Sequence, residues 1–145
     1  MESKIQNATI HLKAVQTDEN NAETVIEFFT SGSYYHKNNA DYIHYTEQGD
    51  GMENVRTTVK VEGDKRVTVI RHGAYNYRFE LTVGERRHAA IETGYGVMLF
   101  GISGVKIEYG LNEFGGKLKF IYMLDANNTL FSTNTFEIEI TNNIQ

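Results

Sequence analysis

The stretch Val55–Gly73, VRTTVKVEGDKRVTVIRHG, restricts the fold of this chain more than any other. Hydrophobic and polar residues alternate along it on both sides of a Gly63-Asp64-Lys65 turn, with the period of two that marks a strand with one buried face. Most of its residues outside the turn favour strands, and its glycines lie only in the turn and at the far end. The pattern therefore predicts a β-hairpin.

The same alternation recurs along most of the 145 residues and predicts about ten strands. Proline is absent, so glycine, asparagine and aspartate must form the turns. We expect a bulge or a sharp bend at Gly32, because it interrupts an otherwise long strand. No segment has the apolar stripe of a helix. The predicted strands cover 8–16, 24–37, 41–48, 55–62, 67–72, 75–83, 89–95, 97–103, 105–111, 118–124 and a last strand through 136–140.

Length and connection lengths predict how these strands are arranged. A chain of 145 residues with a hydrophobic fraction of 40% is typical of one globular domain, here residues 1–145. Short connections favour antiparallel neighbours, so the strands either stack as two sheets or close into a barrel. Closure removes exposed sheet edges, and glycines within strands suit a strongly coiled sheet. We therefore predict an all-β fold, a single antiparallel barrel of 8–10 strands, with a sandwich as the alternative.

Composition argues against several classes of partner. The net charge of −5, from 19 acidic and 14 basic residues, disfavours nucleic acid as the main partner. The short basic cluster Arg86-Arg87-His88 is interpreted as a solvated turn between strands. No window approaches the roughly 18 apolar residues that a membrane span needs, and the first residues lack the apolar run of a signal peptide. We therefore expect a cytoplasmic protein that contacts neither nucleic acid nor membrane.

Arg71 is the most informative candidate for a site. It shares its strand face with Val67 and Val69, so its side chain is predicted to point into the barrel, where an unpaired charge is costly. Three interpretations compete. Arg71 pairs with an internal carboxylate, for which Glu47 is the candidate; or it lies half solvated at the barrel mouth; or its guanidinium holds the carboxylate or phosphate of a ligand.

Aromatic residues add to this pattern, since the chain has nine tyrosines, eight phenylalanines and no tryptophan. A buried tyrosine hydroxyl needs a partner, which fits either positions at the barrel ends or a cavity lined with polar groups. A barrel of this size is either filled by its own side chains or holds one small ligand. The aromatic residues predicted to face inward are Tyr45, Tyr75, Tyr77, Phe79, Tyr95, Tyr109, Phe120 and Tyr122.

Signals for catalysis, metal binding and cofactors are weak. The chain has no cysteine, and its five histidines do not show the spacing of a metal site. The segment Gly101-Ile102-Ser103-Gly104 does not match a nucleophile elbow, and no glycine-rich segment matches a phosphate-binding loop. We therefore predict no enzyme activity, no metal and no cofactor.

Seven short motifs follow one another along the chain: GME at 51–53, TTVKV at 57–61, RHG at 71–73, TGYG at 93–96, GIS at 101–103, GGKL at 115–118 and NTF at 134–136. In this order and spacing they resemble the YwiB-like family of uncharacterised bacterial proteins, over about residues 10–140. One departure is Gly94, where that family usually has proline. The resemblance implies a calycin-like β-barrel with lipocalin-like architecture, from Firmicutes, and it implies no activity.

The leading functional hypothesis is non-catalytic binding of one small amphipathic or apolar molecule inside the barrel. Its headgroup would lie toward Arg71 and Glu47, and its body against Tyr45, Phe79, Tyr95 and Tyr122. The alternative is a filled barrel that acts through its surface, as a protein-interaction module or a homodimer. Its anchors would be the outward-facing apolar residues Val15, Phe29, Ile70 and Ile121.

Overall fold

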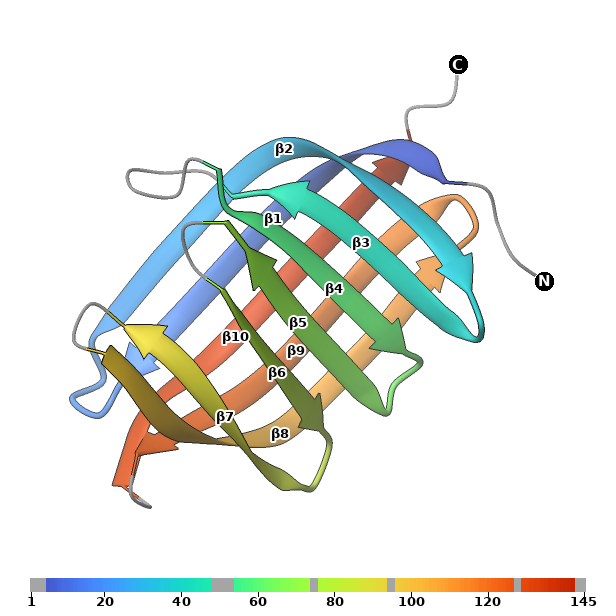
Figure 1. The fold of residues 1–145 in the computed structure, drawn as a ribbon. Coiled ribbons are helices and arrows are strands. Elements are labelled where there is room, and N and C mark those ends of the chain that lie inside the picture. Colours follow the sequence, from blue (N-terminus) through green and yellow to red (C-terminus); the bar gives the residue numbers. More distant parts are fainter. Residues whose placement is uncertain (1–4, 48–53, 74–75, 94–95, 127–128, 143–145) are drawn as a thin grey trace.

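The computed structural model describes residues 5–47, 54–73, 76–93, 96–126 and 129–142, which form a barrel of antiparallel strands (Figure 1). Alternating polar and apolar residues form most of the strands, as the sequence predicted. The ten strands are β1 (Gln6–Asp18), β2 (Glu23–Lys37), β3 (Ala40–Thr46), β4 (Arg56–Glu62), β5 (Arg66–His72), β6 (Tyr77–Thr82), β7 (Arg86–Thr93), β8 (Gly96–Asn112), β9 (Gly115–Ala126) and β10 (Thr129–Asn142).

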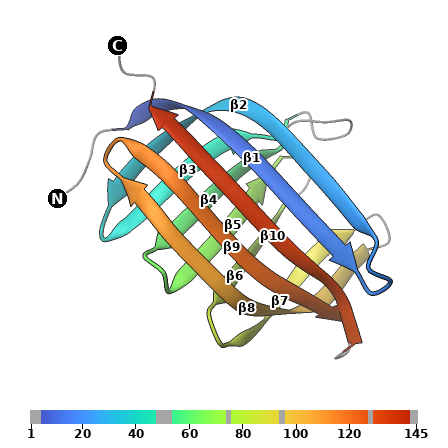
Figure 2. The same cartoon turned by 180° about the vertical axis from the view of Figure 1, so that it is seen from behind.

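The strands form one sheet in the order β6-β5-β4-β3-β2-β1-β10-β9-β8-β7. Consecutive strands pair along almost the whole chain, and the pairing of β1 with β10 joins the two halves (Figure 2). The predicted antiparallel barrel is confirmed, and the sandwich is not formed. Closure is incomplete, because β6 and β7 are the two edge strands of the sheet. We call the boundary between them the seam.

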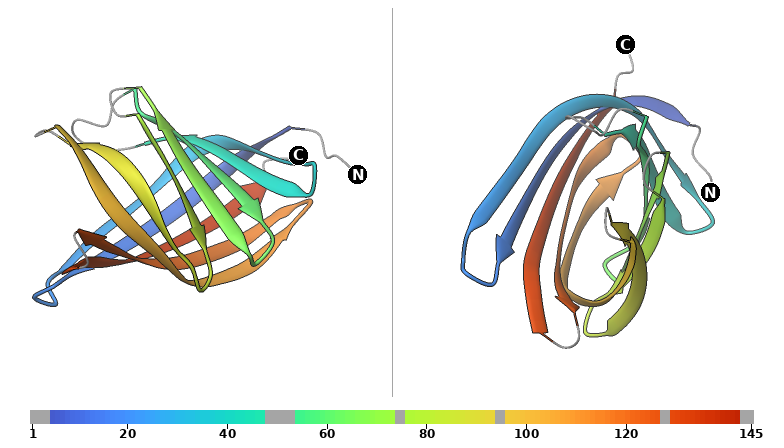
Figure 3. Two further views of the ribbon diagram at one scale, coloured as in Figure 1. Left: turned by 60° about the horizontal axis from the view of Figure 1, so that its bottom comes forward. Right: turned by 60° about the vertical axis from the view of Figure 1, so that its left-hand side comes forward.

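Strand length differs around the barrel. β1, β2, β8, β9 and β10 have 12–17 residues, whereas β3 to β7 have 6–8. The long strands extend past β3 to β6 at the end where β1, β3, β5, β7 and β9 finish, as Figure 3 shows, whereas β7 ends level with the start of β8. We call this end of the barrel the open end. The opposite end, with the turns at 38–39, 63–65, 83–85 and 113–114, is the closed end.

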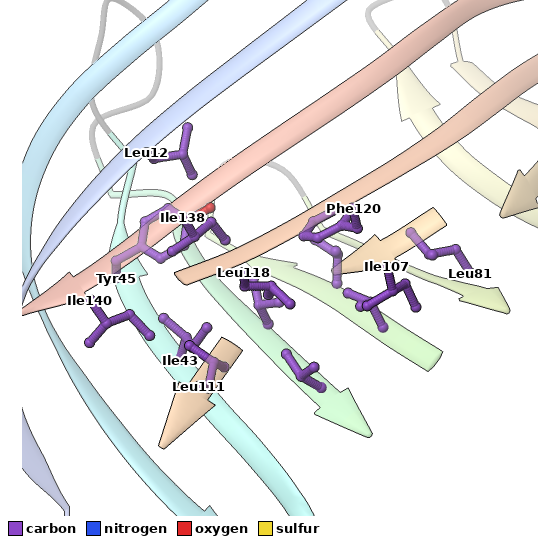
Figure 4. Close-up of a cluster of buried hydrophobic side chains, with 14 of the residues drawn as sticks. Leu12, Ile43, Tyr45, Leu81, Ile107, Leu111, Leu118, Phe120, Ile138 and Ile140 are labelled. Carbon is purple, nitrogen blue, oxygen red and sulfur yellow. The ribbon is translucent and has the colours of Figure 1, made fainter. Parts of the chain in front are cut away.

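The core lies inside the barrel and consists of inward-facing aliphatic and aromatic residues. Side chains from strands far apart in the sequence meet there, among them Ile43, Leu111, Leu118 and Ile140 (Figure 4). The four valines of the β4–β5 hairpin, Val59, Val61, Val67 and Val69, are all buried, as their alternation predicted. A side chain of this kind stabilises the fold by roughly 1.5–3 kcal/mol when it is fully buried.

Two local predictions were wrong. Residues 97–103 and 105–111 form one strand, β8, whose pairing with β9 shifts register between Gly104 and Lys106. This bulge inserts one residue, so the face that Val105 shares with Ile107 in sequence is lost and Val105 is exposed. The Arg86-Arg87-His88 cluster lies within β7 rather than in a turn, and Arg86 pairs with Asp125 across the outer face of the sheet.

Of the two alternatives predicted at Gly32, a bulge or a sharp bend, the bulge is not formed. The pairing of β2 with β1 runs through Gly32 without a register shift, and β2 curves along its length instead (Figure 1). A Cβ atom at this position would lie 2.2 Å from the His44 carbonyl oxygen and 2.4 Å from Ile10 Cδ1. Glycine is therefore required here for close approach between β2, its neighbour β3 and the core.

Candidate ligand-binding site

Arg71 lies at the open end, in a row of inward-facing residues that crosses four strands. Backbone pairing places Tyr45 opposite Thr57, Thr57 opposite Arg71, and Arg71 opposite Tyr77. Glu47 follows two residues after Tyr45, and its Oε2 lies 3.4 Å from Arg71 Nε. The Thr57 hydroxyl donates a hydrogen bond to the same carboxylate oxygen. Of the three competing interpretations of Arg71, the pair with Glu47 is observed; the side chain lies at the mouth but is largely buried and not half solvated.

The hydrogen bonding of Arg71 is incomplete although the side chain is only 21% exposed. Its Nε is buried and makes no hydrogen bond, since the contact with Glu47 is too long and poorly aligned to be one. The guanidinium carbon lies 5.2 Å from the centre of the Tyr77 ring, a cation–π contact. Burial works to lower the pKa of Arg71, but Tyr77 and Glu47 beside it raise that pKa by more, so the side chain stays charged.

Three tyrosines surround this guanidinium and stay protonated. Burial is the main cause that raises the pKa of Tyr45, Tyr77 and Tyr122, and Arg71 only partly offsets it. A protonated phenol both donates and accepts a hydrogen bond. Within the described part of the chain, this cluster at the open end thus contains one cation, one carboxylate and three neutral hydroxyl groups within electrostatic reach of each other.

Aromatic rings form a layer across the barrel interior beside Arg71. The ring centroids of Phe79 and Tyr122 are 5.2 Å apart, and those of Tyr122 and Phe136 are 6.0 Å apart. These rings come from β6, β9 and β10, and β6 pairs with neither of the other two, so the layer spans the interior. Tyr77 stacks on Phe79 at 5.8 Å and continues the layer to Arg71. The layer separates the core below from the open end above.

The walls above this layer are apolar and incompletely buried. Ile26 lies opposite Ala14, on the face of β2 that points inward, and it is 52% exposed. Met98 lies opposite Ile91 on the other side of the opening and is 42% exposed. Phe28, Ile91, Leu124 and Phe136 are partly buried against the core between them. Inward-facing apolar side chains thus remain accessible at this end, whereas those at the closed end are buried.

The structure brings together five of the six residues predicted for the site: Tyr45, Glu47, Arg71, Phe79 and Tyr122. Tyr95, like Tyr75, lies outside the described residues. The prediction missed the walls, which include Ile26, Phe28 and Met98. Their inward orientation follows from the alternation along β2 and β8, but their exposure depends on how far each strand extends past its neighbours. Nothing in a single strand's sequence carries that information.

A second polar cluster, which the sequence analysis also missed, lies at the closed end around Asp41. This residue is 2% exposed and accepts hydrogen bonds from three side chains. Tyr34 Oη lies 2.9 Å from its Oδ1, His36 Nδ1 lies 3.0 Å from the same atom, and the Tyr109 hydroxyl donates to Oδ2. Tyr34 Oη is also 2.8 Å from the carbonyl oxygen of Asn112. The cluster links β2 and β3 to β8 across the barrel, and so closes this end.

The outer face of β1, β8, β9 and β10 carries a shallow groove of about 590 Å³. Lysine and glutamate alternate along it and form ion pairs across strands, such as Lys117 with Glu139 and Lys119 with Glu137. Such exposed pairs are typical of a solvated surface. Among the described residues, no group of three or more metal-binding side chains lies together, and none of them forms a helix long and apolar enough to cross a membrane.

Comparison with known proteins places these features in a family. The family described as a domain of unknown function (DUF1934) matches residues 10–138. The uncharacterized β-barrel protein YwiB of Bacillus subtilis (strain 168) is 36% identical over 115 residues, which cover 79% of this chain and 78% of the relative. The crystal structure of the ywiB protein from Bacillus subtilis matches with a TM-score of 0.73 at 30% identity, over 95% of this chain and 94% of that chain.

Proposed function

The chain belongs to the DUF1934 family, as its resemblance to YwiB predicted, and for this member we propose non-catalytic binding of one small amphipathic molecule at the open end of the barrel. The relative is described as a β-barrel, without an activity. The proposal therefore depends on the open end itself. The observation that carries it is a largely buried guanidinium, paired with one carboxylate, beside apolar walls that remain accessible.

The two parts of the open end suit the two parts of an amphipathic ligand. The polar headgroup would lie at Arg71 and Glu47, near the rim formed by the short strands. The apolar body would lie on the aromatic layer of Phe79 and Tyr122 and against the overhanging face of β2 that carries Ile26 and Phe28. Burial of that body would contribute roughly 25 cal/mol for each Å² of apolar surface removed from water.

Titration with N-phenyl-1-naphthylamine, an uncharged apolar probe whose fluorescence rises on burial, tests the proposal. We expect saturable binding to one site per chain. The variant Ile26→Glu places a charge on the inward face of the opening and should weaken probe binding by about tenfold or more. Ile26 is already half exposed, so the fold should tolerate the change, and urea unfolding checks that it does.

The matched control is Phe29→Glu, on the same strand. Phe29 is 68% exposed, but it lies on the outer face, stacked on His11. We expect this variant to bind the probe as the wild type does. Absence of saturable binding to the wild type would contradict the proposal, and so would equal weakening by the two substitutions.

A second candidate function is homodimerisation, and the distribution of exposed apolar residues favours it. Val25, Val97, Leu99 and Phe131 are exposed near the first residues of β2, β8 and β10, and these strand ends all lie at the open end. Of the anchors expected from the sequence, Phe29 is exposed, whereas Val15, Ile70 and Ile121 are half-buried. Light scattering on a sizing column tests this candidate. A mass of two chains that Val97→Asp reduces to one would support it, and a single-chain mass at all concentrations would contradict it.

A further inference from the structure

We propose that Glu47 makes the open end select an uncharged, carbonyl-bearing headgroup, an amide or ester, over the free carboxylate of the same chain length. This inference rests on the proposed function, because it names the chemical class of the ligand at the same site. Three features of the described residues lead to it: the balance of charge, the hydrogen-bond donors around the Arg71–Glu47 pair, and the burial of both.

The charge of the site is already balanced before any ligand binds. Arg71 and Glu47 form a pair in which the carboxylate is 6% exposed and the guanidinium 21%. Glu47 is the carboxylate that faces Arg71, so the pair is close to neutral and Arg71 has no spare charge for an anion.

The groups around the Arg71–Glu47 pair are mainly hydrogen-bond donors. The Glu47 carboxylate already accepts a bond from Thr57 and lies 3.4 Å from Arg71 Nε. The hydroxyls of Tyr45, Tyr77 and Tyr122 remain protonated around it. A carbonyl oxygen accepts hydrogen bonds from such groups without adding charge.

Burial determines which acceptor fits. A ligand carboxylate at Arg71 would place two negative charges against one positive charge in a partly desolvated site, where their repulsion is screened less than in water. An amide or ester carbonyl uses the same donors without that repulsion. Glu47 is therefore a specificity-determining residue, which leaves the hydrogen-bond donors of Arg71 available and cancels its charge.

The test compares four ligands with the same alkyl chain, by displacement of N-phenyl-1-naphthylamine at pH 8. Octanamide and methyl octanoate carry an uncharged carbonyl, octanoate is an anion, and octylamine is a cation. We expect the wild type to bind octanamide at least about tenfold more tightly than octanoate. Glu47→Gln keeps an oxygen that accepts a hydrogen bond from Thr57 but removes the negative charge that balances Arg71. The ratio of the affinity for octanamide to the affinity for octanoate should therefore fall by about tenfold.

The matched control is Glu27→Gln, which removes an exposed carboxylate from the outer face of β2 and should leave the ratio unchanged. If octanoate binds the wild type as tightly as octanamide, the selectivity is overturned while the proposed function stands, and this result needs no variant to fold. An unchanged ratio in a folded Glu47→Gln variant also overturns it. If none of the four ligands displaces the probe and the probe itself does not bind, both proposals fail.

Discussion

Asp41 shows how a single buried carboxylate holds one end of this barrel. Tyr34 and Tyr109 reach it from strands that are not neighbours in the sheet, so their hydroxyls bridge the interior. The sequence places Asp41 at the start of a strand, where an aspartate next to an Asn-Asn turn is unremarkable. The partners could not be predicted, because Tyr109 is 68 residues away and its orientation depends on the bulge in β8.

Removal of this carboxylate should destabilise the fold. In Asp41→Ala the Tyr109 hydroxyl loses its acceptor and Tyr34 keeps only the Asn112 carbonyl, which predicts a loss of roughly 1–3 kcal/mol in the free energy of unfolding. Tyr109→Phe removes one of the three hydrogen-bond donors to Asp41, so the free energy of unfolding should fall by about 1 kcal/mol. Urea unfolding measures both. Asp64→Ala, in the exposed β4–β5 turn, is the control and should change stability little. Equal stability of Asp41→Ala and the control would contradict this role.

Five tyrosines give the protein a defined response to alkaline pH. Burial is the main cause that raises the pKa of Tyr34, Tyr45, Tyr77, Tyr109 and Tyr122 above the ordinary value of 10.0. Above that pH the unfolded chain releases phenolic protons that the folded chain retains. Stability is therefore fully present below about pH 10 and falls as the pH rises further, by up to about 1.4 kcal/mol per pH unit for each tyrosine. Urea midpoints measured through this range should fall steeply, and less so in Tyr34→Phe; a flat profile would contradict the raised pKa values.

At the scale of elements, the hairpins could be predicted from the sequence, but the bulges that interrupt the alternation of a strand could not. β4 and β5 follow the alternation of Val59, Val61, Val67 and Val69 directly, because each strand pairs with its sequence neighbour over its whole length. β8 does not, because its bulge depends on close approach of the β6–β7 turn to Gly104. A Cβ atom there would lie 2.5 Å from the Thr82 carbonyl oxygen. This contact links segments about 20 residues apart, so the alternation of β8 alone could not reveal it.

Gly32 allows the same argument to be tested in β2. The variant Gly32→Ala forces a methyl group against the backbone of β3, and we expect it to destabilise the fold by about 1–3 kcal/mol. Gly110→Ala is the matched control, since its nearest neighbour, the Lys117 carbonyl oxygen, lies 3.1 Å from the added atom. Thermal unfolding distinguishes them. Loss of stability in Gly110→Ala but not in Gly32→Ala would show that β2 and β3 do not approach each other in this way.

On the scale of the whole molecule, the barrel follows from the sequence but its open end does not. Ten amphipathic strands joined by short connections favour closure into a barrel, because closure leaves few free sheet edges. This holds regardless of which strands are long. The overhang of β1, β2, β8, β9 and β10 arises only when they pair with one another on one side of the barrel. The pairing of Arg71 with Glu47 was predictable because both lie on inward faces near strand ends. The apolar walls above them were not, since they depend on this overhang.

The seam makes the barrel unevenly stable. Among the described residues no backbone ladder joins β6 to β7, and side chains such as Arg87, which contacts Glu80 and Thr82, bridge them instead. Amide hydrogens on these two edges should therefore exchange with solvent faster than those of β9 and β10, which are paired on both sides. Hydrogen exchange followed by NMR measures this. Equal protection of the seam and of β9 would indicate a fully closed barrel.

Binding at the open end is the central claim, and an NMR titration of the labelled protein with octanamide tests it most directly. We expect saturable shifts for Ile26, Arg71, Tyr77 and Tyr122, with the outer-face residues Phe29 and Lys119 unaffected. Chemical-shift changes confined to the outer face, or no changes up to the solubility limit of octanamide, would contradict binding inside the open end.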